Sequence, residues 1–270
     1  MNFYLELEQA LFSEDINTKE LIVDRAIEYC RNENANFDTI EPKTPKSPSY
    51  SKICKIVDPK DLPKRGNFSN REDLIALVHS ITHIEFSAID LAIDAVYRYP
   101  FMPLEYKLDW LIVAQDEIRH FKMLIKLLKK LNSYYGELPV HKGLFDACCN
   151  TKDLVIDRMA VLPRYFEASG LDVNPKIINK LKNYKSSPII LELIEALGII
   201  YEEEIDHVKK GDRWFKYLCD KDNLDYMQTY RDILNKYNLH GRANQFDIEG
   251  RKRAGFSCKE LIGLGAKSCS

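Results

Sequence analysis

Apolar residues recur at steps of three and four along most of the chain after residue 70, whereas no segment alternates convincingly between apolar and polar positions. The first pattern is typical of amphipathic helices and the second of strands. Four long helices are predicted, over residues 71–97, 103–135, 151–169 and 188–220, with a short helix at 175–184. Gly136 and Gly170 are the expected stop signals. The sequence therefore predicts an all-α fold.

The first forty residues have the pattern of two amphipathic helices, at 2–12 and 18–31. A connector with five prolines between Pro42 and Pro63 follows, and it has no sustained periodicity. Such a segment is expected to be an extended, mostly irregular strap. We therefore predict three parts: N-terminal helices and strap at 1–69, a helical bundle at 70–221 and a C-terminal helical extension at 222–270.

Polar residues interrupt the apolar stripes of the predicted bundle. In the second helix the stripe is interrupted only by Glu117 and His120, and in the fourth helix only by Glu204 and His207. Both pairs have the spacing Glu-x-x-His, and both are expected to point inward. The first helix places one carboxylate, Glu85, in its apolar seam.

The third helix is less regular because Pro163 falls inside it. Proline removes a backbone donor, so a break is expected near residues 161–164. Glu167 lies one turn beyond this proline and is the candidate for a fourth inward carboxylate. Asp157 is the substitute should Glu167 point to solvent.

Four buried carboxylates must be neutralised, because burying an unpaired charge costs several kcal/mol. Two divalent cations would balance the four negative charges and leave two neutral histidines as ligands. A Glu from each of two helices plus Glu-x-x-His from each of two others is the ligand set of di-iron and di-manganese carboxylate bundles. Oxygen and imidazole ligands suit two iron ions, with manganese or a mixed iron/manganese pair as alternatives.

At this point the sequence resembles a known family. The six ligand candidates resemble those of a ferritin-like di-iron site. More narrowly, five stretches resemble the ferritin-like family catalogued as domain of unknown function 455. They are "THIEFSAIDLAIDA", "DEIRHF", "RMAVLPRYFEASGLDVNP", "YEEEIDHVKKGDRWF" and "RKRAGFSCKEL". The resemblance implies a ferritin-like four-helix bundle but names no reaction.

Other polar residues near these stripes allow two interpretations each, one functional and one structural. Asp116 and Glu203 precede a ligand Glu and are either outer partners of the ligands or solvated acids. Asp157, Arg158 and Arg164 surround Pro163 and either orient ligands or form a structural network. His79 and His83 are spaced by one helical turn and could bind a metal as a pair, but they point away from Glu85, which favours satisfied surface or interface histidines.

Composition and charge bear on the binding partners, the cellular location and the state of the cysteines. A net charge of −2 gives no global reason to bind nucleic acid or a membrane. The acidic N-terminus does not resemble a signal peptide, and we expect no apolar run near the roughly 20 residues of a membrane span. The sequence therefore predicts a cytoplasmic protein. Seven scattered cysteines without a Cys-x-x-Cys pair indicate mostly reduced core residues.

The predicted function is that of an oxidoreductase that activates dioxygen or peroxide at two iron ions, with an unknown reductant. One alternative is a hydroxylase of a large substrate such as a tRNA nucleoside, by analogy with a ferritin-like tRNA hydroxylase family. Another is a non-enzymatic protein that uses the metal for stability or iron handling, or that binds a partner. The substrate, small molecule or RNA, is not indicated, and a homodimer remains an option.

Overall fold

A computed structural model describes residues 2–37, 40–66, 68–239 and 246–269. It divides into two compact units. The first unit comprises residues 1–149 and 184–196, and the second comprises 150–183 and 197–270. Each unit is described by itself. The three-part division at residues 69 and 221 stays a prediction.

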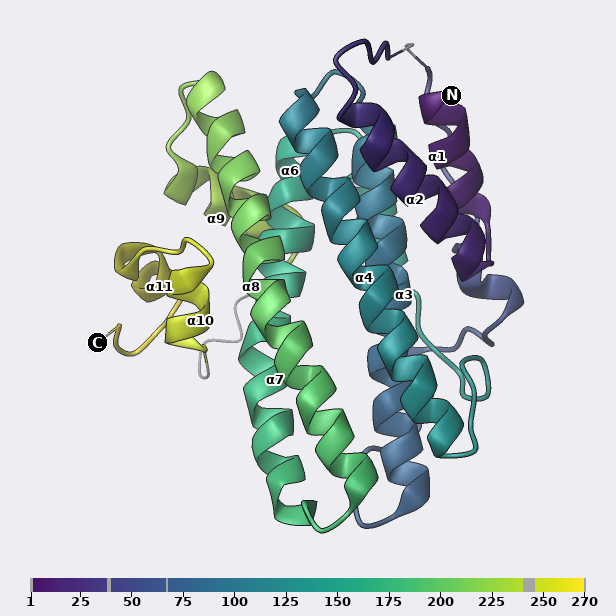
Figure 1. The fold of residues 1–270 in the computed structure, drawn as a ribbon. Coiled ribbons are helices and arrows are strands. Elements are labelled where there is room, and N and C mark those ends of the chain that lie inside the picture. The colour runs from purple at the N-terminus through teal and green to yellow at the C-terminus, as the bar shows by residue number, and fades with distance from the viewer. Residues whose placement is uncertain (1, 38–39, 67, 240–245, 270) are drawn as a thin grey trace. The chain divides into compact units, whose positions relative to one another are not determined.

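The first unit is built on a pair of long helices. Its helices are α1 (Phe3–Phe12), α2 (Ile16–Cys30), α3 (Arg71–Arg98), α4 (Leu104–Lys130) and α5 (Gly143–Asn150, whose last residue falls in the second unit). Figure 1 shows α3 and α4 side by side, with α2 against α4 and α1 against α2 and α3. Asn2, Asp15 and Asn70 cap the helices that they precede by accepting backbone N–H groups, as expected for Asn and Asp.

The predicted strap is confirmed. Among the described residues between α2 and α3, the regular structure consists of two short 3₁₀ turns, Ser49–Lys52 and Pro59–Asp61. Tyr50 anchors the strap, because its ring is buried and packs edge-on against Phe86 of α3. An isolated parallel bridge between Ile56 and Val140 joins the strap to the segment after α4.

The second unit holds a long interrupted helix and the C-terminal helices. Its elements are α6 (Val155–Val161), a π-helix, η3 (Leu162–Glu167), α7 (Ala168–Leu181), the 3₁₀ turn η4 (Lys182–Tyr184, partly in the first unit), α8 (Pro188–Lys221, from residue 197 onward), α9 (Tyr226–Lys236), α10 (Ile248–Arg253) and α11 (Cys258–Gly263). α9 packs on α6, and α10 packs on α7. The described residues form no strand, so the all-α prediction is confirmed.

The interruption predicted at Pro163 is confirmed, but the helix does not end at Gly170. The α-helix changes to a π-helix at Leu162 and resumes at Ala168. α7 then continues through Gly170 and Pro175, so the two helices predicted at 151–169 and 175–184 are joined. Ala168 and Leu171 are buried in a cluster with Val208 of α8 and Leu261 of α11. Burial of this face stabilises helix where glycine alone favours a stop.

α3 is more apolar than expected. It contains an 18-residue window of mean hydropathy 1.4, which by length and composition is enough to cross a membrane. However, 78% of that window is buried inside the protein. The core helix of a soluble protein has the same properties, so the expectation that no such stretch exists was wrong, while a membrane span gains only weak support.

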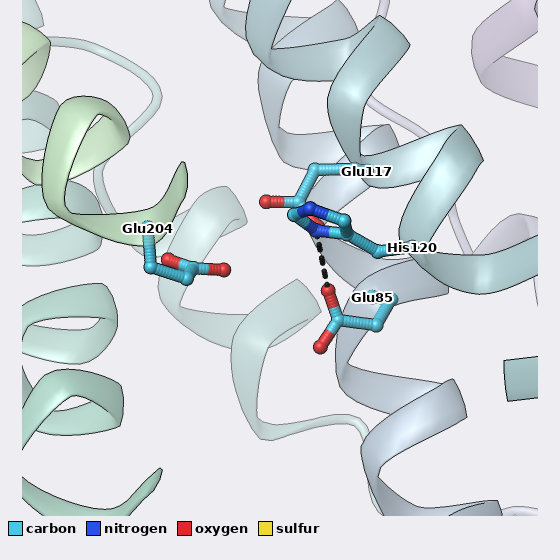
Figure 2. A group of neighbouring side chains, drawn as sticks. All are labelled: Glu85, Glu117, His120 and Glu204. Carbon is cyan, nitrogen blue, oxygen red and sulfur yellow. Dashed lines mark hydrogen bonds and ion pairs between the residues drawn. The ribbon is translucent and has the colours of Figure 1, made fainter. Parts of the chain in front are cut away.

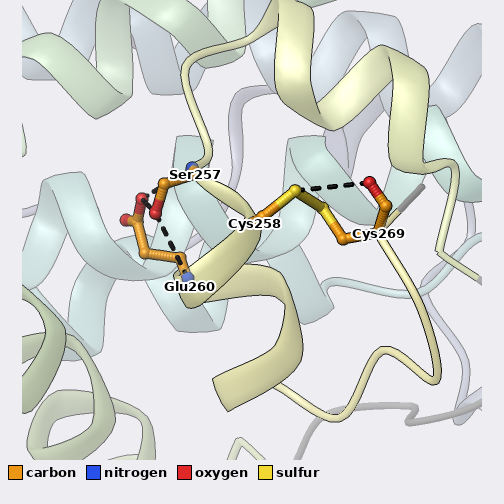
Figure 3. Close-up of a disulfide and its surroundings, with 4 residues drawn as sticks. All are labelled: Ser257, Cys258, Glu260 and Cys269. Atoms are coloured by element: carbon orange, nitrogen blue, oxygen red, sulfur yellow. Dashed lines mark hydrogen bonds between the residues drawn. A yellow bond between two sulfur atoms is a disulfide. The ribbon is translucent and has the colours of Figure 1, made fainter.

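Cysteine pairing also differs from the expectation. Cys30, Cys54, Cys148 and Cys219 are buried thiols, as predicted. Cys258 and Cys269 instead form a disulfide that closes a C-terminal loop (Figure 3). The sequence spacing gave no sign of this bond, because the chain turns back after α11 to bring the two residues together.

Candidate metal centre

The apolar seams of α3 and α4 carry Glu85, Glu117 and His120 into the interior of the first unit. The apolar residues about one turn before and after them on the same faces are buried as well: Ile81, Ala88, Val113 and Leu124. Glu85 is 3% exposed, and Glu117 and His120 are fully buried. Helical spacing therefore explains why three polar side chains from two helices meet in one place.

The three side chains form a close cluster. Nδ1 of His120 lies 3.3 Å from Oε2 of Glu85 and 3.3 Å from Oε2 of Glu117. One ligand atom from each residue lies within 4.8 Å of the others. Figure 2 shows the two carboxylates and the imidazole turned toward one another. Glu204, also drawn there, belongs to the second unit and is described with it.

The electrostatics of the cluster favour a cation. The pKa of Glu85 is raised to about 8, first by burial and then by the charge of Glu117, while His120 acts in the opposite direction. Oε2 of Glu85 receives no hydrogen bond of good geometry from the described residues. Nδ1 of His120 can carry one proton but faces two carboxylate oxygens. Two carboxylates and an imidazole that lie this close together could hold a metal ion.

The second unit contains the repeat of the same pattern. Nδ1 of His207 lies 4.0 Å from Oε2 of Glu204, three residues earlier on α8. His207 is buried, and Glu204 is partly buried. Glu167 is the last residue of the π-helix and is also partly buried. Each unit thus carries one predicted Glu on one helix and Glu-x-x-His on another.

The candidates for outer partners belong to several networks. Asp116 forms an ion pair with Arg119, and Glu203 is partly exposed on α8. Buried Asp157 accepts hydrogen bonds from Lys236, the last residue of α9, and from Tyr237, which follows it. Arg158 donates to Thr151. These contacts tie α6 to its neighbours, which favours the structural reading for Asp157 and Arg158.

Arg164 is the outer candidate with the most extensive described contacts. It is fully buried three residues before Glu167, on the same π-helix. Its guanidinium pairs with Asp212 and Glu260. Sequence reasoning proposed Arg164 without these partners, because both are distant along the chain.

His79 and His83 are not surface residues, which corrects that expectation. Both are buried, and they bind the segment that follows α4. Nε2 of His79 accepts the N–H of Gly136, and the ring nitrogens of His83 lie within hydrogen-bond distance of Tyr135 Oη and the carbonyl of His141. Burial lowers the pKa of each histidine to about 4. Their role is to anchor a loop.

Comparison with known proteins agrees with the resemblance at the level of the family. Residues 12–262 match the family described as "Protein of unknown function (DUF455)". The chain belongs to this family. An uncharacterized protein of Haemophilus influenzae is 36% identical over 213 residues, which cover 76% of this chain and 72% of that protein. No solved structure matches. Membership in the DUF455 family therefore leaves the reaction to be argued from the site.

Proposed function

We propose that this DUF455 protein is a ferritin-like di-iron carboxylate protein and an oxidoreductase that acts on dioxygen or peroxide. The observation that carries the proposal is the buried cluster of Glu85, Glu117 and His120, in which one helix supplies a carboxylate and the next supplies Glu-x-x-His. The ferritin-like four-helix arrangement is part of the proposal. It assigns α3, α4, the α6–η3–α7 run and α8 as the four helices.

The residues fit iron or manganese. The cluster offers carboxylate oxygens and an imidazole nitrogen and no thiolate. Hard oxygen donors combined with imidazole suit iron and manganese, whereas thiolate would favour softer metals. Glu85, Glu117 and His120 would hold one ion. Glu167, Glu204 and His207 repeat the pattern and would hold the second.

When bound, a pair of redox-active metals supplies the electrons for reducing dioxygen or peroxide. The chain itself does three things. Buried apolar residues around the cluster exclude bulk water, since every neighbour in the α3 and α4 seams is buried. Two helices fix the ligand atoms before any ion arrives, which reduces the ordering needed on binding. The low-dielectric surroundings also strengthen the attraction of the carboxylates for a cation.

Metal analysis tests the ligand assignment. Protein purified from iron-replete or manganese-replete medium is expected to contain about two first-row metal ions per chain, the number in a dinuclear site. Glu117→Gln keeps the size of the side chain, removes one charge and should lower the metal content. Glu105→Gln on the exposed start of the same helix is the matched control and should bind as the wild type does. A wild-type protein that contains no metal under either condition would refute the proposal.

A second experiment separates catalysis from structural metal. The protein is loaded with two ferrous ions without oxygen and then mixed with oxygenated buffer, and dioxygen consumption is recorded. Rapid consumption is expected, and it should be lost in His120→Gln. Two bound ions with no consumption over minutes would instead support a structural or iron-handling role.

The reductant, the substrate, the cytoplasmic location and a homodimer stay predictions.

A further inference from the structure

Arg164 makes contacts through both its side chain and its backbone, although it lies in an irregular helix. Its Nε lies 3.0 Å from Oδ1 of Asp212, and its Nη2 donates to Oε1 of Glu260 at 2.5 Å. The guanidinium carbon lies 4.7, 4.3 and 4.6 Å from the ring centres of Phe215, Tyr230 and Phe256. Tyr230 also donates its hydroxyl to the backbone carbonyl of Arg164. Side chain and backbone are therefore both fixed.

Charge balance makes this arrangement depend on Glu260. Lys216 joins the group at 2.8 Å from Asp212 Oδ2, so two acids and two bases are brought together. Burial alone would raise the pKa of Glu260, but Arg164 and the hydrogen bonds from Ser257 hold it below its usual range. Removing one partner of a buried ion pair leaves an uncompensated charge, which is strongly unfavourable. Arg164 is expected to move when Glu260 is neutralised.

Glu260 belongs to the C-terminal segment, residues 246–269, and that segment fixes its orientation. The N–H and hydroxyl of Ser257 both donate to Oε2 of Glu260 at 2.8 Å, which leaves Oε1 for Arg164. This capping box begins α11, and the disulfide from Cys258 to Cys269 closes the loop behind it (Figure 3). Leu261 anchors the segment in the core with Ala168 and Leu171.

We propose that the C-terminal segment sets the position of Glu167 through Arg164, and so regulates how tightly the second metal is held. The inference rests on the proposed function, in which Glu167 is a ligand. Arg164 and Glu167 lie three residues apart on one six-residue π-helix. A π-helix is rare and persists where its surroundings hold it. Releasing Arg164 removes one such restraint, so Arg164 acts as a positioning residue for Glu167.

The test uses the full-length chain and two readouts, hydrogen exchange of residues 162–170 and Mn²⁺ titration followed by the electron paramagnetic resonance of free Mn²⁺. Glu260→Gln keeps the shape of the side chain and removes its charge. We expect exchange in 162–170 to accelerate and the dissociation constant of one Mn²⁺ site to rise about 10-fold, as for other groups that orient a ligand. The other Mn²⁺ site should keep its affinity.

Ile233→Val is the matched control, because it removes one buried methylene from α9 of the same unit without touching a charged group. It should leave both readouts unchanged. If Glu260→Gln does not fold, Arg164→Lys replaces it, since lysine keeps the charge but loses the forked contact to two acids. Either variant should give the same two changes.

Two results would overturn the inference. One is equal exchange in 162–170 for Glu260→Gln and Ile233→Val. The other is faster exchange with both Mn²⁺ affinities unchanged, which would make Arg164 purely structural. These failures leave the proposed function standing, because the wild type would still bind two ions. A wild type that binds no metal overturns both.

Discussion

At the scale of single residues, α3 buries polar side chains for two different reasons. His79 of α3 is buried with its Nε2 accepting N–H groups from Gly136 and Leu138, so its polarity is satisfied by the loop that it holds. Glu85, further along the helix, faces another carboxylate and has its pKa raised to about 8. A satisfied buried group stabilises the fold, whereas two acids that face each other are a place where a cation could bind.

His79→Gln should flatten the acid dependence of stability. The pKa of His79 is about 4 in the folded protein against 6.5 in the reference state, so between these values only the unfolded chain binds the proton. The histidine therefore lowers the free energy of unfolding as pH falls from 6.5 to 4, by about 1.4 kcal/mol per pH unit. It has no such effect above pH 6.5. Glutamine can still accept the two N–H groups but does not titrate.

Urea denaturation between pH 4 and pH 7 measures this difference. The two proteins should have similar stability at pH 7, where His79 is neutral in both states. They should diverge progressively below pH 6.5, with the variant losing less stability. Parallel curves across the whole range would show that another group determines the acid sensitivity.

At the scale of elements, the π-helix depends on a close approach between two helices of the second unit. A Cβ at Gly211 of α8 would lie 2.2 Å from Cβ and 2.4 Å from Cγ of Pro163. Glycine is required there because any side chain would push the two helices apart. Pro163 thus interrupts the α-helix, and the absence of a side chain at Gly211 leaves space for the Pro163 ring.

Gly211→Ala should destabilise the protein although alanine favours helix. The gain in helix propensity is at most about 1 kcal/mol, whereas overpacking at a fixed contact costs about 1–3 kcal/mol. Gly198→Ala is the matched control on the same helix, because a Cβ there meets nothing within 4 Å. Chemical denaturation should show Gly198→Ala as neutral or stabilised and Gly211→Ala as less stable. Equal stabilisation of both variants would show that Pro163 moves aside easily.

At the scale of the whole molecule, the C-terminal segment completes the core of the second unit. Its Phe256 and Leu261 are buried together with Leu171 of α7 and Val208 of α8. Arg251 of α10 forms a two-point ion pair with Asp172 of α7. The disulfide restrains the end of this segment, where Cys258 is exposed to solvent.

Loss of the disulfide should weaken the C-terminal segment first. Cys258 and Cys269 are 11 residues apart, and closing a loop of this size contributes about 2–3 kcal/mol in the chain-entropy account. Cys258→Ser should therefore speed hydrogen exchange in α11 before it affects α3 or α4. Cys149→Ser, which removes a thiol of the first unit that is not in the disulfide, is the control. A thiol count of seven in the oxidised wild type would contradict the bond.

The sequence by itself determined the all-α class, α3 and α4, and the inward direction of Glu85, Glu117 and His120. These features depend on helical periodicity, and a residue three or four positions from an apolar neighbour shares its face whatever the rest of the chain does. The interruption at Leu162 was predictable for a similar reason, because proline acts on its own turn.

Only the tertiary structure decided which partners these residues have. It buried His79 and His83 against a loop that follows α4, carried α7 through Gly170 and paired Cys258 with Cys269. It also placed Asp212 and Glu260 on Arg164. Each of these outcomes joins segments that are distant along the chain or is stabilised by packing against them, and local spacing carries no information about such contacts.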